Sequence, residues 1–529
     1  MIKKLFHWFV GHQQGSAAAV ITLSSFALLT KFLALVQQAL TARLFGVSPQ
    51  TDAYFVAQGV PVLMGGLMAS SVSTALTRDF SRESSPDRVR GLLLLVTLGA
   101  LVCSAFLALT SGPAVWFTGP GLSGATRQMA VFLARLMSFL FVFFSVTGVM
   151  QAYCYAQAIF VVPAIASLLP YAGGILGAYL LGRPLGIQGL VVGYGAGLAM
   201  QAATVSAPFL FRQLGRSQSP AALPASRASA TGFVRSLTLV FLSLVVSQIY
   251  FITDRSLAST YGPGLAASFG FAASIFSLPL QLVVLSVSNA LLPSLSRLVS
   301  EKRLAELARK VESLIWIVAF LIVPLALLLL LGSTPMTQLL YEGNAFDPTA
   351  TAMTAAVLQG YSLGLIGFAF KDIATSILLA CNLEKWPALV GMICIVANLG
   401  AAWALGALVG HLGIAYATTG IFLFNAAALL ALISRKLALS WRVGLKRSGW
   451  KIALAAITLV AVYALSRQAM IAAPGRLLGL GIEFGRLGLA ALSYLAVCWL
   501  LGLPELQELL ARYAQPLKRM TTHEGGAVH

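Results

Sequence analysis

The sequence predicts an all-α integral membrane protein that crosses the bilayer about fourteen times, with about 20 apolar residues for each crossing. Of its 529 residues, 58% are hydrophobic and only 10% are charged. Soluble globular chains carry roughly 25% charged residues. Because a soluble core cannot hold this much apolar surface, the surplus must face lipid.

Long segments without Asp, Glu, Lys or Arg give the positions of the spans. The segment 387–434 is long enough for two spans, which we expect to be joined by a tight turn near His411 and Gly413. The apolar runs predict spans at 18–45, 52–77, 91–111, 127–153, 161–181, 187–211, 233–256, 265–296, 311–332, 350–379, 387–409, 412–434, 451–470 and 477–503.

The basic residues predict the orientation. Most of the 35 Lys and Arg residues fall in connections that lie on one side when the predicted spans alternate, as Arg88, Arg303 and Lys446 do. Short cytoplasmic loops retain Lys and Arg, so this side and both termini are predicted to be cytoplasmic. The net charge of +19 therefore sets topology and needs no nucleic acid as a partner.

Motifs of catalysis and metal binding are missing from the sequence. It contains no GxxxxGK[ST] phosphate loop, no HExxH and no Gly-x-Ser-x-Gly elbow, so we do not expect an enzyme. The five cysteines are scattered singly and show neither a zinc spacing nor a disulfide framework. We expect any transport to be driven by a gradient or the membrane potential rather than by bound ATP.

Composition divides the chain into lobes. A polar stretch rich in Ser, Ala, Pro and Arg separates the sixth and seventh predicted spans and reads as a linker. The predicted parts are an amphipathic cytoplasmic N-terminus at 1–17, an N-lobe at 18–211, the linker at 212–232, a C-lobe at 233–434, two appended helices at 435–503 and a cytoplasmic tail at 504–529.

The second and eighth predicted spans show a weak internal sequence similarity. Each opens on aromatic residues, carries a central proline (Pro61 or Pro279) and continues with small residues. Proline inside a span frees a backbone carbonyl and bends the helix, so these residues are candidates for a gate or hinge. Ordinary kinks satisfied by neighbouring helices are the alternative reading.

Seven charged residues are predicted to lie inside spans or at their ends: Lys31, Arg43, Asp52, Asp254, Arg255, Lys371 and Asp372. An ionised group near mid-bilayer costs roughly 2.5–3.5 kcal/mol, so it should face a cavity or a partner. Lys31 has no adjacent acid and is the best candidate for a cation lining a central cavity; a lysine snorkelling to the inner face is the alternative. The adjacent pairs Asp254–Arg255 and Lys371–Asp372 are expected to pair with other helices, since neighbouring residues point about 100° apart.

Residues 29–80, and above all ARLFGVSPQTDAYFVAQGVP at 42–61, resemble the opening of the MviN/MurJ lipid II flippases. This family belongs to the multidrug/oligosaccharidyl-lipid/polysaccharide exporter superfamily. Further similar fragments are VSQIYFITDRSLAS, LLPSLSR, LYEGNAFD and YSLGLIGFAFKDI. The resemblance implies two six-helix lobes around a central cavity and a lipid-tail groove at the last two helices. It also implies alternating-access export of an undecaprenyl-pyrophosphate-linked saccharide across a bacterial inner membrane.

The substrate-binding set implied by charge and resemblance is Lys31, Arg43, Asp52, Arg255 and Lys371. Several family positions differ in this chain. Gln37 and Gln38 stand where an arginine–aspartate pair is usual, Ser70 and Ser71 replace an acid–glycine pair, and Ala273 and Ser274 replace an aspartate and an arginine. Lysine cannot replace bidentate arginine clamps in kind. An exopolysaccharide repeat unit therefore fits at least as well as lipid II.

Some relatives also bind sodium in the second lobe. By resemblance, Asp254, Asn398 and Thr418 occupy oxygen-bearing positions of that site, whereas Ala402 stands where a second carboxylate would be. Sodium coupling is thus a weak hypothesis, and no other cofactor is expected. Beyond the lipid substrate and the bilayer, polysaccharide or cell-wall synthesis proteins are the expected partners.

Two alternative functions remain open from sequence. A cation-coupled multidrug exporter of the same superfamily would favour acidic cavity residues, of which this chain offers few. A non-transporting scaffold of a polysaccharide synthesis complex would explain the missing arginines.

Overall fold

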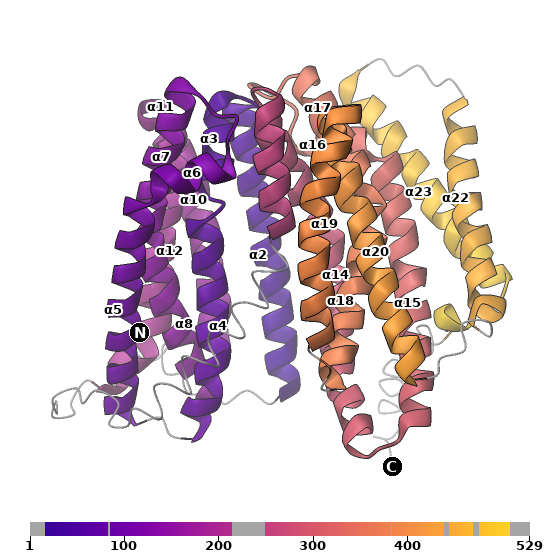
Figure 1. The fold of residues 1–529 in the computed structure, drawn as a ribbon, viewed down its shortest axis with the longest axis horizontal. Helices are drawn as coiled ribbons and strands as arrows, with labels where there is room; N and C mark the ends of the chain where they lie inside the picture. The colour runs from indigo at the N-terminus through magenta and orange to yellow at the C-terminus, as the bar shows by residue number, and fades with distance from the viewer. Residues whose placement is uncertain are drawn as a thin grey trace, which may run out of the picture. The chain divides into compact units, whose positions relative to one another are not determined.

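The computed structural model describes residues 16–82, 85–213, 249–381, 383, 385–437, 444–468 and 475–507. Within these ranges the secondary structure is helical, apart from an isolated bridge between Gly343 and Phe346 (Figure 1). The predicted all-α membrane class is therefore confirmed. Most of the predicted N-terminal segment, linker and tail lies outside the described residues.

The helices follow the apolar runs closely. In the first part of the chain they are α2 (Ser16–Phe45), α3 (Pro49–Ala57), α4 (Pro61–Arg82), α5 (Pro86–Leu109), α6 (Ser111–Thr118), α7 (Gly124–Ser138), α8 (Leu140–Ala156), α9 (Val161–Ala166), α10 (Leu169–Leu180), α11 (Gly182–Leu185) and α12 (Ile187–Gln213). Residues 249–258 are helical and lead into η1 (Ser259–Tyr261).

The remaining helices are α14 (Leu265–Ser300), α15 (Leu304–Leu331), α16 (Ser333–Leu340), α17 (Pro348–Ser362), α18 (Gly364–Ala380), α19 (Lys385–Val409), α20 (His411–Leu437), η2 (Leu445–Gly449, a π-helix), α22 (Trp450–Gln468) and α23 (Arg476–Leu500). The predicted tight turn is confirmed: Gly410 joins α19 to α20 at φ +77, a conformation that glycine adopts without strain.

The described residues contain 11 helices that are long and apolar enough to cross a membrane, or 12 if α17 and α18 form one bent span. The predicted count of fourteen is not confirmed. The seventh predicted span, 233–256, lies mostly outside the described residues.

The described helices group into two compact units. The first comprises residues up to Ser274 together with Tyr341–Met353, and the second comprises Ile275–Leu340 and the chain from Thr354 onward. The chain therefore passes from the first unit to the second within α14, returns after the end of α16 and passes to the second unit again within α17. The division into lobes of six, six and two spans remains a prediction.

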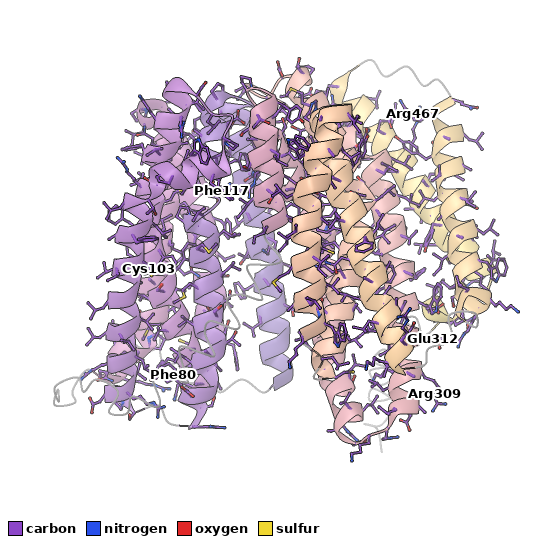
Figure 2. The ribbon with its side chains drawn as sticks, in the orientation of Figure 1. Phe80, Cys103, Phe117, Arg309, Glu312 and Arg467 are labelled. Atoms are coloured by element: carbon purple, nitrogen blue, oxygen red, sulfur yellow. The ribbon has the colours of Figure 1, made fainter. Side chains whose placement is uncertain are left out.

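In the first unit, α4, α5 and α12 run beside α8 (Figure 1). Val72, Leu76 and Phe80 of α4 enter a core cluster with Val149 of α8 and Phe209 of α12. Figure 2 shows Phe80 toward one end of this unit and Phe117 toward the other.

Glycines bring α10 and α12 into direct backbone contact. A Cβ atom on Gly193 would lie 2.3 Å from the carbonyl oxygen of Gly173 and 2.5 Å from the Cα atom of Gly177. Such close approach is available only to residues without a side chain, and it strengthens van der Waals packing in lipid, where the hydrophobic effect does not hold helices together.

In the second unit, α22 and α23 pack on each other and on α15. The hydroxyl of Tyr494 donates to the carbonyl of Phe320 at 3.0 Å, and that of Tyr463 reaches the carbonyl of Leu331 at 3.2 Å. An ion pair between Arg486 and Glu483 (2.6 Å) lies on α23. The two tyrosine hydrogen bonds fix the appended pair to α15, whereas the ion pair is internal to α23.

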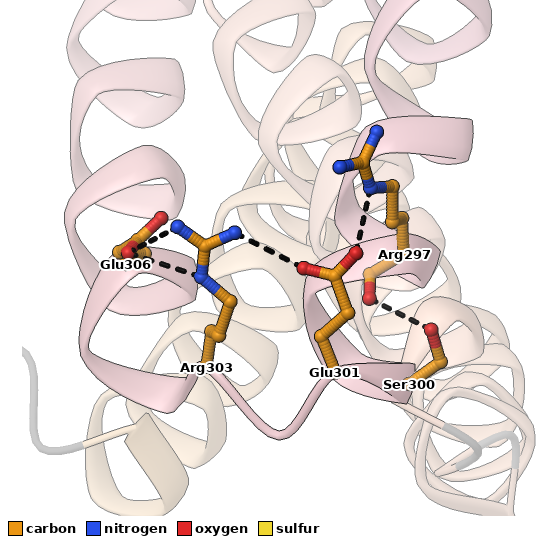
Figure 3. Close-up of polar contacts among 5 residues, drawn as sticks. All are labelled: Arg297, Ser300, Glu301, Arg303 and Glu306. Carbon is orange, nitrogen blue, oxygen red and sulfur yellow. Dashed lines mark hydrogen bonds and ion pairs between the residues drawn. The ribbon is translucent and has the colours of Figure 1, made fainter.

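An ion-pair network joins the ends of α14 and α15 (Figure 3). Glu301 accepts hydrogen bonds from Arg297 (2.7 Å) and Arg303 (3.0 Å), and Arg303 also bonds Glu306. The two arginines lower the pKa of Glu301 because they stabilise its charged form, Arg297 more strongly.

The ends of the second unit carry the charges that the topology assigned to opposite sides. Figure 2 shows Arg309 and Glu312 toward the same end and Arg467 toward the opposite end. Arg309 precedes the predicted span 311–332 and Arg467 lies near the end of the predicted span 451–470, so the two arginines mark opposite ends of this unit.

The two prolines of the internal sequence similarity have different settings. Pro61 is the first residue of α4, after a break that follows α3, whereas Pro279 lies inside the continuous α14. Matched bends at equivalent places are therefore not seen. Proline is well tolerated at a helix start, because its missing N–H has no partner there. Pro208 and Pro324 also lie inside long helices.

We expect Gly193→Val to destabilise the first unit, because the added side chain must push α10 and α12 apart. Overpacking of this kind costs typically 1–3 kcal/mol. Thermal unfolding of purified protein in detergent measures the loss. Gly99→Val is the matched control, since a Cβ atom there meets nothing within 4 Å; equal losses for the two variants would contradict the packing argument.

Candidate functional site

The short helix α3 begins with a capping box. The side chain of Ser48 accepts a hydrogen bond from the Thr51 amide, and the Thr51 hydroxyl accepts one from the Ser48 amide at 2.9 Å. The same hydroxyl also bonds the carbonyl of Gly46 at 3.0 Å. These bonds satisfy the free amides of the first turn and fix the direction in which the next residue, Asp52, points.

Asp52 caps the N-terminus of α14. Its side chain is 2% exposed, and both carboxylate oxygens accept backbone hydrogen bonds. The amide of Gly264 donates to Oδ2, and the amide of Ala267 donates to Oδ1 at 2.7 Å. The first amides of a helix lack partners and lie at the positive end of the helix dipole, so they favour a buried anion.

Aromatic packing surrounds this cap. The ring of Phe55 meets that of Phe271 edge-on at 5.0 Å between centroids, and Phe271 contacts Tyr341 and Phe346. The Tyr341 hydroxyl donates to the carbonyl of Phe271 at 3.2 Å. Arg255 donates to the carbonyl of Phe55 at 3.3 Å. We call residues 43–56, 255–271 and 341–346 the Asp52 junction; all belong to the first unit.

Two glycines permit the close approach of backbones in the junction. Gly46 has φ +63, and a Cβ there would lie 2.1 Å from the carbonyl oxygen of Ala345. Gly264 has φ +85, and a Cβ there would lie 2.4 Å from Val47. The amide of Ala345 donates to the carbonyl of Arg43 at 3.0 Å, which adds a backbone hydrogen bond to the Asp52 junction. The side chain of Arg43 is exposed.

Lys31 lies on an exposed part of α2. Its neighbour Thr30 holds the helix in place by bonding Ser167 at 2.7 Å. Among the described residues, no carboxylate lies within ion-pair distance of Lys31. No acid of the described residues therefore pairs with this lysine, and its role in lining a cavity remains a prediction.

Lys371 is arranged differently from the expectation. It is 7% exposed, and its Nζ lies 2.6 Å from the carboxylate of the adjacent Asp372 and 4.2 Å from the centre of the Phe368 ring. The expectation that this pair seeks partners on other helices was wrong, because the flexible lysine stem lets neighbouring residues meet. Lys371 is buried and paired, which makes it a poor first contact for substrate.

The positions that differ from the family pattern are neutral, and several of them are buried. Gln37 is buried and lies against Gly174, where a Cβ would come within 2.8 Å of the Gln37 amide. The Nε2 of Gln38 is buried with no hydrogen-bond partner in the described part of the chain. Ser71 is buried and bonds the carbonyl of Leu67. These groups add no positive charge.

The residues suggested for sodium fit the ion poorly. Thr418 donates its hydroxyl to Asn398 Oδ1 at 3.1 Å, so these two side chains lie together, but Ala402 offers no ligand. Asp254 belongs to the first unit and these residues to the second. In the described part of the chain, no group of three or more His, Cys, Asp and Glu side chains comes together. Sodium favours oxygen-rich sites, so the set is incomplete.

Sequence reasoning missed the partners of Asp52 and the aromatic packing around it. Backbone amides have no sequence signature, and Phe271, Tyr341 and Phe346 look like ordinary apolar residues. The glycine at 264 before an apolar run was the one usable signal, because glycine often precedes a helix start.

Comparison with known proteins gives the family. Residues 41–484 match the family model described as Lipid II flippase MurJ. The chain is 26% identical over 455 residues to a protein of Synechocystis sp. named "Probable lipid II flippase MurJ", covering 82% of this chain and 83% of that protein. It is 24% identical over 415 residues to the "Lipid II flippase MurJ" of Burkholderia cenocepacia, covering 75% and 79%.

Solved structures show the same fold. The structure titled "Lipid II flippase MurJ, inward closed conformation" is similar with TM-score 0.76 and 21% identity, over 93% of this chain and all of that chain. An inward-facing multidrug resistance MATE family transporter of the MOP superfamily is similar with TM-score 0.65 and 15% identity, over 79% and 98%.

We expect Asp52→Ala to destabilise the first unit more than Asp52→Asn does. Alanine leaves the amides of Gly264 and Ala267 buried without acceptors, at about 1–3 kcal/mol each, whereas asparagine keeps one acceptor oxygen. Thermal unfolding in detergent measures the difference. Asp87→Ala is the control, because Asp87 is half exposed and lies 3.9 Å from Arg90; a loss as large as that of Asp52→Ala would argue against the capping role.

Proposed function

The chain belongs to the MurJ family of lipid II flippases, and we propose that it moves an undecaprenyl-pyrophosphate-linked saccharide from the inner to the outer leaflet of a bacterial inner membrane. The observation that carries the proposal is Lys31, an exposed cation within a membrane span that no acid among the described residues neutralises. An ammonium in that position is costly unless water or an anion compensates it. A lipid-linked pyrophosphate supplies such an anion.

The chemistry divides between headgroup and tail. The charged and sugar-bearing headgroup needs a hydrated path through the protein, and Lys31 would bind its phosphate there. The polyprenyl tail can stay in the bilayer. The family resemblance implies a lipid-tail groove at the last two helices, so α22 and α23, which pack on α15 as a pair, are our candidate for holding the tail.

The Asp52 junction would act as the outer gate. It is held by backbone hydrogen bonds to a carboxylate and by aromatic contacts, both of which can separate without breaking a helix. The chain passes between the two units within α14 at 274–275, four residues before Pro279, and within α17. We propose that α14 bends near Pro279 during transport and acts as the hinge. Pro61, in contrast, is the first residue of α4, after the break that follows α3.

The membrane potential would drive export. A headgroup with two negative charges that moves outward gains roughly 4.6 kcal/mol across a 100 mV inside-negative potential. The incomplete oxygen set at Asn398 and Thr418 supports a mechanism without sodium. We also propose that both termini lie in the cytoplasm. Cell-wall or polysaccharide synthesis proteins are the partners that we propose.

The substrate class includes lipid II and related lipid-linked oligosaccharides. Gln37, Gln38 and Ala273 are neutral, so the site has fewer cations than a bidentate clamp on a pyrophosphate needs. A multidrug exporter is supported less well, because the buried acid Asp52 already accepts two backbone hydrogen bonds and is not free to bind a cationic drug.

We expect Lys31→Ala to lower export of a fluorescent lipid II analogue in proteoliposomes at least tenfold, since a lost charge-assisted hydrogen bond is worth about 1.5–3 kcal/mol. Lys31→Arg should retain most of the activity. Lys385→Ala, which removes an exposed lysine at the start of α19, is the matched control. Normal export by Lys31→Ala, at equal protein incorporation, would remove Lys31 from the substrate path.

We expect the distribution of the analogue between leaflets to follow the imposed potential. At zero potential it should equalise, whereas at 100 mV an energy of roughly 4.6 kcal/mol favours the positive side by about three orders of magnitude. Replacement of sodium by choline should leave the rate unchanged. A rate that requires sodium at fixed potential would show ion coupling instead.

A further inference from the structure

One face of α4 carries four hydroxyl side chains at helical spacing: Ser70, Thr74, Thr77 and Ser81. Residues three or four apart lie above one another on a helix, so the four form a continuous row. The row extends over about 16 Å at 1.5 Å per residue and runs to the end of the helix that carries Arg82. Gly66 continues it by one turn, with open space around its Cβ position.

This row is exposed, and its surroundings are not those of a lipid-facing helix. Ser70, Thr74 and Ser81 are exposed and Thr77 is half-buried. The neighbouring α5 exposes large apolar side chains, such as Leu98 at 57% and Phe106 at 64%, as expected in contact with lipid. Among the described side chains of α4, no large apolar residue is exposed. An exposed face of a membrane span that carries hydroxyls and no large apolar side chain is suited to water or a polar ligand.

The hydrogen bonds of the row decide what it can bind. Each hydroxyl donates its single proton to the carbonyl four residues earlier, at 3.1 Å for Ser70 and at 2.8, 2.6 and 2.8 Å for the others in order. A hydroxyl has one proton and two lone pairs. With its proton used inside the helix, each side chain presents only acceptor lone pairs outward.

We propose that this acceptor row binds the donor-bearing saccharide of the transported lipid, through the hydroxyl and acetamido N–H groups of its sugars. The inference rests on the proposed function and adds a division of labour to it. A phosphate group offers only acceptor oxygens and would have to displace a helical hydrogen bond at each step of the row. The phosphate is therefore left to Lys31, while the sugars follow α4.

The row also gives a reason for the neutral residues on this helix. Ser70 stands where the family pattern has an acid. The serine supplies a neutral hydrogen-bond acceptor at a position where the family has a charged one. A neutral row contacts uncharged sugar donors without the desolvation cost of a carboxylate. Recognition by several weak acceptors suits a ligand with many hydroxyls.

The test compares two lipids that share the polyprenyl tail and the pyrophosphate, of which only lipid II carries the peptide-bearing saccharide. The full chain in nanodiscs is titrated with lipid II and with undecaprenyl pyrophosphate, and the two Kd values are measured. For the variant Ser70→Ala/Thr74→Val/Thr77→Val/Ser81→Ala, we expect binding of lipid II to weaken about tenfold or more. Binding of undecaprenyl pyrophosphate should stay within about twofold of the unaltered protein.

Matched variants separate recognition from folding. Thr204→Val removes an exposed hydroxyl that makes the same helical hydrogen bond on α12, and it should leave both Kd values unchanged. Thr74→Ser/Thr77→Ser keeps the acceptors and should bind lipid II normally. Equal weakening for both lipids, or undiminished binding of lipid II by the quadruple variant, would overturn the proposal.

Measurements on the unaltered protein separate failure of the proposed flippase function from failure of the proposed role of α4. If it binds neither lipid, the proposed function fails and the acceptor row falls with it. If it binds and exports lipid II while the quadruple variant does so equally well, the flippase function stands and the role of α4 is refuted.

Discussion

A buried carboxylate holds together segments of the first unit that are far apart in sequence. Asp52 accepts hydrogen bonds from the amides of Gly264 and Ala267, which are the unsatisfied donors at the start of α14. A helix that begins in an apolar environment needs such a partner, because neither lipid nor packed side chains can accept these bonds. The cap therefore fixes where α14 starts and which part of the chain lies against it.

Other features of the junction depend on this cap. Once α14 is anchored, Phe271 contacts Phe55 and Tyr341, and the backbone of Ala345 approaches Arg43 closely enough to bond it. A carboxylate bonded to two amides forms a strong yet reversible contact, since no covalent bond or helix must be broken to release it. A transporter that alternates between two access states needs a contact of this kind.

The polar groups of the first unit fall into two chemical types. Lys31 provides positive charge, whereas the hydroxyls of α4 provide neutral acceptors whose protons are already used. A lipid-linked saccharide has the complementary pair of properties, an anionic phosphate and sugars rich in donors. In the second unit, the buried Lys371 pairs with the partly exposed Asp372, so the two opposite charges compensate each other within α18.

The sequence alone determined the membrane class, the positions of most spans and the turn at Gly410, because hydrophobicity and charge act over distances of a single helix. It also gave the family through the motif at 42–61. Tertiary structure decided what Asp52 bonds, that Lys371 meets its own neighbour, and that Pro61 and Pro279 are not equivalent. It also decided which hydroxyls of α4 are exposed. These outcomes depend on backbone amides, side-chain reach and burial, which arise only when distant segments come together.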